Sequence, residues 1–126
     1  MQHAPGFLKL AESARSTVRE VSVTQVRAMQ AAGEGFHFVD VREDDEWRAG
    51  HCAGAVHVGR GVLERDIEGL VAEAGAPIVL YCGGGFRSAL AAESLAKMGF
   101  TQVLSMAGGI RAWREAGAPE EVPHQP

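Results

Sequence analysis

Hydrophobic and polar positions along the chain change period several times, and each change marks a predicted element. Two compact apolar runs rich in β-branched residues, 36–41 and 77–81, are typical of buried strands, and shorter runs at 55–58 and 103–104 predict two more. Apolar residues at helical spacing predict amphipathic helices between these runs. These helices are expected at 6–19, 24–30 with Thr24 as N-cap, from 44 onward, 63–71, 87–98 and 110–115.

Strands and helices alternate, and the connections between them are tight. This order predicts an α/β fold with a small central parallel sheet and helices on both faces. The expected organisation is an N-terminal amphipathic helix in 1–20, one domain over 21–119 and a loose tail over 120–126. Mixed charge on the first helix favours docking on its own domain over a membrane surface.

Composition and charge exclude several classes of protein. The 126 residues carry 12 Lys plus Arg against 16 Asp plus Glu, a net charge of −4 that argues against nucleic-acid binding. No run approaches the roughly 20 apolar residues that would span a bilayer, and the first residues lack a secretory pattern. Two cysteines cannot build a disulfide scaffold, so a reduced, cytoplasmic setting is expected.

The segment from Cys82 to Arg87 carries the clearest chemistry in the chain. It directly follows the strand predicted at 77–81 and leads into a helix, and it includes Gly83, Gly84 and Gly85 before Phe86. Ligands of open α/β sheets bind at this edge, and consecutive glycines let backbone N–H groups point inward as an anion-binding nest. The helix dipole and Arg87 favour the thiolate, which is the nucleophilic form of cysteine. The residues therefore predict an activated cysteine in an anion-holding cup.

The chain resembles the single-domain rhodanese sulfurtransferases over about residues 21–119. Four blocks carry the resemblance in the family's order. They are Asp40-Val-Arg42-Glu43 with Glu46-Trp47 and Gly50-His51-x-x-Gly54-Ala55; Arg60-Gly-Val-Leu-Glu64; Cys82-x-x-Gly85-x-Arg87-Ser88; and Gly108-Gly109-Ile110-x-x-Trp113 with Gly117-x-Pro119.

The resemblance implies a sulfurtransferase that works by double displacement at Cys82. The thiolate takes the outer sulfur of thiosulfate or a persulfide donor and becomes a persulfide, which cyanide or a thiol then consumes. The loop from Gly83 to Ser88 would hold the persulfide, with Arg87 helping to hold the loop and the anionic donor. No metal or organic cofactor is implied. The partners are a small-molecule sulfur donor and a thiol acceptor, with a partner protein as a further option.

Two alternatives stay open on the same loop. Cysteine phosphatases of this layout separate Cys and Arg by five residues, whereas Cys82 and Arg87 are separated by four, so a phosphatase or arsenate-reducing enzyme is disfavoured. Some thiosulfate-using relatives carry a basic residue inside the loop, and this loop has none before Arg87. That departure supports a protein-to-protein sulfur relay or binding module with weak activity on small donors.

Four further charged residues are expected to support the site. Asp40 and Arg42 end a predicted strand, where a bracket that holds the loop is favoured over direct substrate contact. Arg60 is a candidate for meeting an anionic donor, while Glu64 is expected to face away or to pair with an arginine.

The sequence also holds a weaker metal pattern and a second thiol. His51, Cys52 and His57 lack the four-ligand spacing of a structural zinc site, so no metal site is predicted. Cys52 could act as a resolving thiol for Cys82, but a small buried hydrophobe is favoured.

Overall fold

Five parallel strands form the central sheet of this computed structural model, which describes residues 3–123. The strand order is β1-β6-β5-β2-β4, so the strand before the cysteine loop is central. The strands are β1 (Arg19–Val21), β2 (His37–Asp40), β4 (Val56–His57), β5 (Ile78–Tyr81) and β6 (Val103–Met106). A second, two-stranded sheet pairs β3 (His51–Cys52) with β7 (Glu120–Glu121) in antiparallel orientation. The predicted parallel sheet is confirmed.

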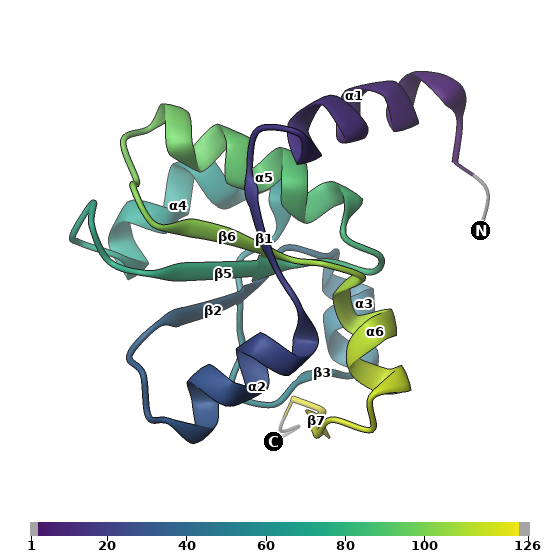
Figure 1. Cartoon of the computed structure of the whole chain (residues 1–126), viewed down its shortest axis with the longest axis vertical. Coiled ribbons are helices and arrows are strands. Elements are labelled where there is room, and N and C mark those ends of the chain that lie inside the picture. The colour runs from purple at the N-terminus through teal and green to yellow at the C-terminus, as the bar shows by residue number, and fades with distance from the viewer. Residues whose placement is uncertain (1–2, 124–126) are drawn as a thin grey trace.

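Helices cover both faces of this sheet, as the alternation of elements predicts (Figure 1). Helices α4 and α5 pack on one face, and α2 and α6 pack on the other. Helix α1 lies outside this layer against α5. The helices are α1 (Pro5–Arg15), α2 (Val23–Ala31), α3 (Asp44–Ala49), α4 (Leu63–Leu70), α5 (Phe86–Lys97) and α6 (Gly109–Glu115), with a 3₁₀ turn at Arg60–Val62.

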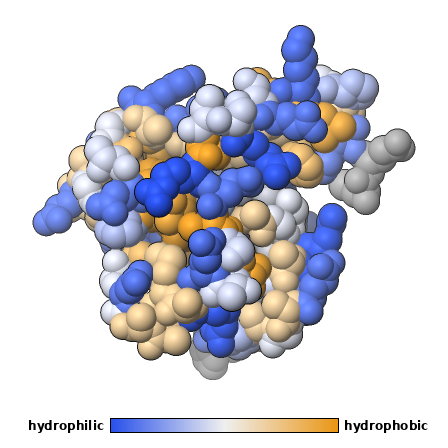
Figure 2. Space-filling model, viewed as in Figure 1, coloured by the Kyte–Doolittle hydropathy of each residue, from blue (hydrophilic) through white to orange (hydrophobic). Residues whose placement is uncertain are grey.

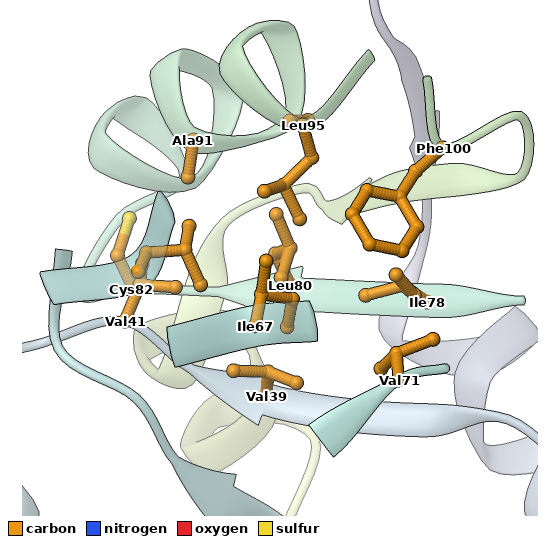
Figure 3. Packing of buried hydrophobic residues seen from close by; sticks show 12 residues of the cluster. Val39, Val41, Ile67, Val71, Ile78, Leu80, Cys82, Ala91, Leu95 and Phe100 are labelled. Atoms are coloured by element: carbon orange, nitrogen blue, oxygen red, sulfur yellow. The ribbon is translucent and has the colours of Figure 1, made fainter. Parts of the chain in front are cut away.

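The alternation of side chains along β5 divides the core into two clusters. Ile78 and Leu80 face α4 and α5, whereas Val79 and Tyr81 face α2 and α6. All four side chains are fully buried, as expected for a parallel strand covered on both faces. Figure 3 shows Cys82 at one end of the first cluster, next to Ala91 of α5, so the packing of the core positions the cysteine.

The N-terminal part of the chain differs from the prediction in two places. Helix α1 ends at Arg15, and β1 replaces the expected last turn because residues 19–21 pair with β6 in parallel. Helix α2 is capped by Ser22 rather than Thr24. The Ser22 side chain accepts from the backbone N–H of Gln25, whose own side chain accepts from the N–H of Ser22. This reciprocal pair satisfies two backbone donors, which Thr24 cannot do from inside the helix.

The expected loose tail is wrong at its start. Glu120 and Glu121 pair with Cys52 and His51 in the small sheet, and the side chain of Glu121 accepts from the backbone N–H of Gly54. Two exposed glutamates give no strand pattern in the sequence, so this pairing depends on the position in space at which α6 ends. The parts of the predicted segments at 1–2 and 124–126 lie outside the described residues.

The face shown in Figure 2 mixes both kinds of residue, with hydrophobic ones towards the middle and hydrophilic ones on the projecting parts. Over the described residues 3–123, none of the helices has the length and apolar character needed to cross a membrane. Helix α1 buries Ala11 and Ala14, and the contact is with the protein's own α5.

Candidate active site

Cys82 follows β5 directly, and backbone N–H groups surround its sulfur. The N–H of Gly85 and the N–H of Ser88 donate to Sγ at 3.2 and 3.3 Å. The first amides of α5 point at this position, and no side chain in the described part of the chain caps that helix. The positive end of the α5 dipole therefore acts on the sulfur. These contacts have the geometry that the anion-holding cup requires, and the binding of an anion there stays a prediction.

Close contact between the cysteine loop and α6 shapes the cup. The N–H groups of Ile110 and Arg111 donate to the carbonyl oxygens of Cys82 and Gly83 at 2.9 and 3.1 Å. Gly109 sits at φ +55°, and a Cβ there would overlap the carbonyl oxygen of Cys82 and lie 2.7 Å from the carbonyl carbon of Gly83. Only glycine allows this approach. The Gly108-Gly109 motif thus lets α6 pack directly against the loop.

A pair of buried serines extends the polar surroundings of the sulfur. The thiol of Cys82 donates to Oγ of Ser88 at 3.5 Å, and this oxygen lies 2.8 Å from Oγ of Ser105. Both serines are fully buried. When the sulfur is a thiolate, the Ser88 hydroxyl can turn and donate to it while still accepting from Ser105. The sequence prediction missed Ser105, because a single Ser in a short apolar strand carries no signal of its partner.

Arg87 is engaged by a carboxylate in this structure. Its Nη1 and Nη2 donate to Oε1 and Oε2 of Glu46 at 2.8 and 3.1 Å, a bidentate pair. The hydrogen bond from Arg87 lowers the pKa of Glu46 to about 2, so the pair is ionised at neutral pH. Arg87 also lies against the loop, 3.1 Å from the position of a Cβ on Gly83. The pair ties α3 to the first turn of α5 beside the cysteine.

Asp40 and Arg42 form a buried bracket behind the loop. The guanidinium of Arg42 donates to both carboxylate oxygens of Asp40 at 2.8–3.1 Å and to the carbonyl oxygen of Gly50 at 2.7 Å. Asp40 is level with Tyr81 in the sheet, so both strands end beside Cys82. The carboxylate of Asp40 raises the pKa of the guanidinium against the opposing effect of burial. The pair is buried and bonded to Gly50, and its role as a bracket for the loop stays a prediction.

Arg60 and Glu64 lie away from the cup, in contrast to the expectation that Arg60 meets a donor. Nη1 of Arg60 donates to both carboxylate oxygens of Glu64 at 2.8 Å, and Nη2 donates to Oγ of Ser94 on α5 at 3.1 Å. Within residues 3–123, neither residue lines the cavity in front of Cys82. The 3₁₀ turn before α4 directs Arg60 towards the middle of α5 instead of its first turn. The predicted pairing of Glu64 with an arginine does occur.

A cavity of about 430 Å³ opens in front of Cys82. Gly83, Gly84 and Arg87 of the loop line it, together with Arg42 and Glu46 behind. Its other walls come from segments near both ends of the sequence, and none of these residues was predicted to belong to the site. They are His3 and Phe7 from the N-terminal segment and Ile110, Arg111, Arg114 and Glu115 from α6.

Cys52 and the two histidines have structural surroundings. Cys52 is fully buried in the cluster on the other face of the sheet from Cys82, and burial raises the pKa of its thiol to about 12. The ring of Trp47 stacks on His51 at 3.5 Å and on His57 at 5.0 Å between centroids. One nitrogen of His57 lies 2.7 Å from the carbonyl oxygen of Arg42. In the described residues, no group of three or more His, Cys, Asp or Glu side chains is arranged to hold a metal ion.

Comparison with known proteins places these features in one family. A protein of Bacillus subtilis named as a candidate sulfur carrier, YrkF, is 31% identical over 78% of this chain, and the chain spans about half (52%) of its length. The thiosulfate sulfurtransferase GlpE of Shewanella oneidensis is 34% identical over 82% of this chain and 99% of that protein.

One solved structure adds a different name. A protein of unknown function from Rhodopseudomonas palustris, described as a possible tyrosine phosphatase, is 32% identical, with a TM-score of 0.84 over 96% of this chain and 98% of its own. The family model described as "Rhodanese-like domain" matches residues 22–116, which include the loop, its bracket and the α6 glycines. On this match and on the relatives above, the chain belongs to the rhodanese-like domain family.

Proposed function

We propose that this protein is a sulfurtransferase that carries sulfur as a persulfide on Cys82. The observation that carries the proposal is the pair of N–H donors on the Sγ atom of Cys82, at the start of a loop of four residues before Arg87. Such oriented donors stabilise negative charge on sulfur as an oxyanion hole does on oxygen. Membership of a family that includes thiosulfate sulfurtransferases supports the same chemistry.

The reaction has two displacements at sulfur. The Cys82 thiolate attacks the outer sulfur of thiosulfate, the S–S bond of the donor breaks, and sulfite leaves with the bonding electrons. Cyanide or a thiolate then attacks the terminal sulfur of the persulfide, and the Cys82 thiolate returns as the leaving group. A persulfide donor follows the same path and releases its thiolate. Every step moves one sulfur atom without net oxidation by an external agent, so no cofactor is needed.

The other residues of the site act through position and charge. The amides of the segment from Gly83 to Ser88 would hold the terminal sulfur of the persulfide. The Glu46–Arg87 pair would keep the end of the loop in place, and the buried Asp40–Arg42 pair would support the neighbouring strand end. A reduced cytoplasm suits a reaction that needs a free thiolate, and a relay to a partner protein is the alternative outcome for the second step.

A cysteine phosphatase is the second candidate, because a similar solved structure carries that description. Phosphatase chemistry needs the loop arginine to bind the equatorial oxygens of a phosphoryl group. Here both Nη atoms of Arg87 already bind the carboxylate of Glu46. The geometry therefore favours sulfur transfer over phosphate transfer.

The test is the intact mass of the purified protein before and after incubation with thiosulfate or glutathione persulfide. We expect a gain of one sulfur atom that cyanide removes, and no gain in the Cys82→Ser variant. Cys52→Ser serves as the matched control and should load like the wild type, because its thiol is buried on the other face of the sheet.

Other outcomes separate the alternatives. Loading from glutathione persulfide but not from thiosulfate would favour the relay. No loading from either donor, together with hydrolysis of an aryl phosphate, would replace the proposal by the phosphatase.

A further inference from the structure

The cavity in front of Cys82 has an aromatic wall that comes from outside the matched family segment. Phe7 of α1 and His3 line the cavity, and the family model begins only at residue 22. The rings of His3 and Phe7 lie 5.0 and 6.2 Å from that of Phe86 between centroids, at steep angles. The guanidinium of Arg15 lies 5.6 Å from the centre of the Phe86 ring. Helix α1 thus joins Phe86 to build a fixed apolar surface beside the cup.

Four arginines of the described chain also line the cavity, and three of them are paired with carboxylates. Arg42 binds Asp40, Arg87 binds Glu46, and Nε of Arg114 donates to Glu120 at 3.0 Å. Arg111 differs, because its guanidinium makes no ion pair or side-chain hydrogen bond within residues 3–123. One nitrogen of the exposed Arg111 side chain lies 3.9 Å from the position of a Cβ on Gly84, so this charge lies beside the cysteine loop.

Glu115 also lines the cavity and follows Arg111 by one helical turn. The two side chains form no ion pair in this structure, although residues four apart on a helix are within reach of each other. The nearby carboxylate should weaken, without removing, the attraction of Arg111 for an anion. This opposition provides a direct test of the charge argument, since removal of Glu115 should have the opposite effect to removal of Arg111.

From these observations we propose that the cavity beyond the cup is a subsite for the organic part of a sulfur donor or acceptor. The ligand class is a thiol or persulfide with an apolar body and an anionic group. The body packs against Phe7 and Phe86, and the anionic group binds Arg111. Figure 1 shows the loop before α5 between α1, which carries Phe7, and α6, which carries Arg111. The role of this subsite in catalysis rests on the proposed sulfur transfer, whereas the binding of such a ligand to the cavity does not depend on it.

The size of the cavity supports this class over an inorganic anion. A volume of about 430 Å³ falls in the range of pockets that enclose small organic molecules. Thiosulfate has no apolar part, so it would leave the aromatic wall unused. In the transfer step the acceptor thiolate attacks the terminal sulfur of the Cys82 persulfide. The S–S bond of the Cys82 persulfide breaks with its electron pair going to Cys82, whose thiolate returns. The acceptor leaves as an organic persulfide.

The first experiment measures binding without any sulfur chemistry. 3-Phenylpropanoate, which has the body and the charge, is titrated into the full-length protein and followed by protein NMR shifts. The neutral 3-phenylpropanol and the small acetate are the matched ligands. We expect 3-phenylpropanoate to bind at least fivefold more tightly than either one, with shifts on Phe7, Gly84 and Arg111.

Variants assign the two contacts separately. Arg111→Gln should weaken 3-phenylpropanoate about fivefold to tenfold and leave 3-phenylpropanol unchanged, whereas Arg111→Lys should retain part of the preference. Arg114→Gln is the matched control and should change binding less than twofold, because that guanidinium is bonded to Glu120. Glu115→Gln should tighten binding about twofold. Phe7→Ala should weaken both aromatic ligands about fivefold, with Phe7→Leu in between if α1 stays docked.

The second experiment follows sulfur transfer from the loaded protein to two thiols, 2-mercapto-3-phenylpropanoate and 2-phenylethanethiol. Arg111→Gln should raise KM for the first thiol only, with kcat for the second unchanged. Equal binding of all three ligands, or equal effects of Arg111→Gln and Arg114→Gln, would overturn the subsite. Normal binding with no loading of Cys82 would instead overturn the proposed function and leave the subsite standing.

Discussion

The two cysteines of this protein are almost equally buried, yet they differ in the hydrogen-bond donors around the sulfur and in the access of the sulfur to a cavity. Cys82 is 1% exposed and Cys52 is 0% exposed. Two backbone N–H groups donate to the sulfur of Cys82, at the N-terminus of α5 and at the edge of a cavity. Cys52 packs in a hydrophobic cluster with Phe38, and burial raises its pKa. Two equally buried thiols therefore differ in what surrounds the sulfur: Cys82 has two backbone N–H donors beside a cavity, whereas Cys52 lies in apolar packing, where burial raises the thiol pKa.

The largest expected effect is a difference in alkylation rate between the two thiols of the folded protein. With a pKa of about 12, Cys52 at pH 7 exists as thiolate at a fraction of roughly 10⁻⁵. Iodoacetamide should therefore modify Cys82 at least 100-fold faster than Cys52, measured by peptide mass mapping over time. Comparable rates, or a disulfide between the two under mild oxidant, would contradict the comparison.

The second effect concerns Gly109, where the start of α6 packs against the backbone of Cys82 and Gly83. Gly109→Ala places a methyl group against the carbonyl groups of Cys82 and Gly83, in a backbone conformation with positive φ. We expect a loss of about 3 kcal/mol in the free energy of unfolding and loss of sulfur loading. Urea denaturation and intact mass measure the two effects. Gly69→Ala is the control, because a Cβ there meets nothing within 4 Å in α4, and it should stabilise by about 0.5–1 kcal/mol.

A smaller effect is expected from the hydroxyl next to the reactive sulfur. Ser88→Ala removes one donor to the Cys82 thiolate but keeps the backbone N–H. We expect about a tenfold fall in the single-turnover rate of loading, below the effect of removing an oxyanion donor, because sulfur is a weaker acceptor. Ser94 on the same helix accepts a hydrogen bond from Arg60 instead, so Ser94→Ala should leave the rate of loading unchanged. Equal rates in both variants would show that the hydroxyl has no part in the cup.

The smallest expected effect is the contribution of Glu46 to the pH dependence of the free energy of unfolding. Its pKa is lowered from 4.5 to about 2 in the folded protein, first through the hydrogen bond from Arg87. Its stabilisation is therefore complete above about pH 4.5 and is lost as the pH falls towards 2. Since Glu46 and Arg87 are about one third exposed, we expect this contribution to be about 1 kcal/mol.

Glu46→Gln provides the check on this last prediction. Unfolding by urea at pH 7 and at pH 3 should show a smaller fall in stability for the variant than for the wild type. An equal fall in both proteins would mean that the Glu46–Arg87 pair does not hold the loop.

The sequence alone was sufficient to predict the central part of the site. The apolar run at 77–81 followed at once by Cys82 and three glycines predicts a strand, a turn and a helix, and all three occur there. These features are local, because they depend on propensity and on residues fewer than about ten positions apart. The strand at 19–21 was missed, since its pairing with β6 depends on residues more than 80 positions away.

Local patterns were sufficient for the pairing of Glu64 with an arginine, but they could not decide which arginine lines the cavity. The sequence singled out Arg60, and not Arg111, as a candidate for meeting an anionic donor. The fold pairs Arg60 with Glu64 and places Arg111 beside the cysteine loop.

The sequence by itself was sufficient to predict the α/β class, the parallel sheet and the position of Cys82 directly after a central strand, because hydrophobic period and glycine spacing act over short distances. Only the tertiary structure decided that Phe7 and Arg111, 104 positions apart, form two walls of one cavity. It also decided that Cys52 lies buried on the other face of the sheet from Cys82. The physical reason is that side-chain partners are chosen by packing across the sheet, and this information is spread over the whole chain rather than held in any one segment.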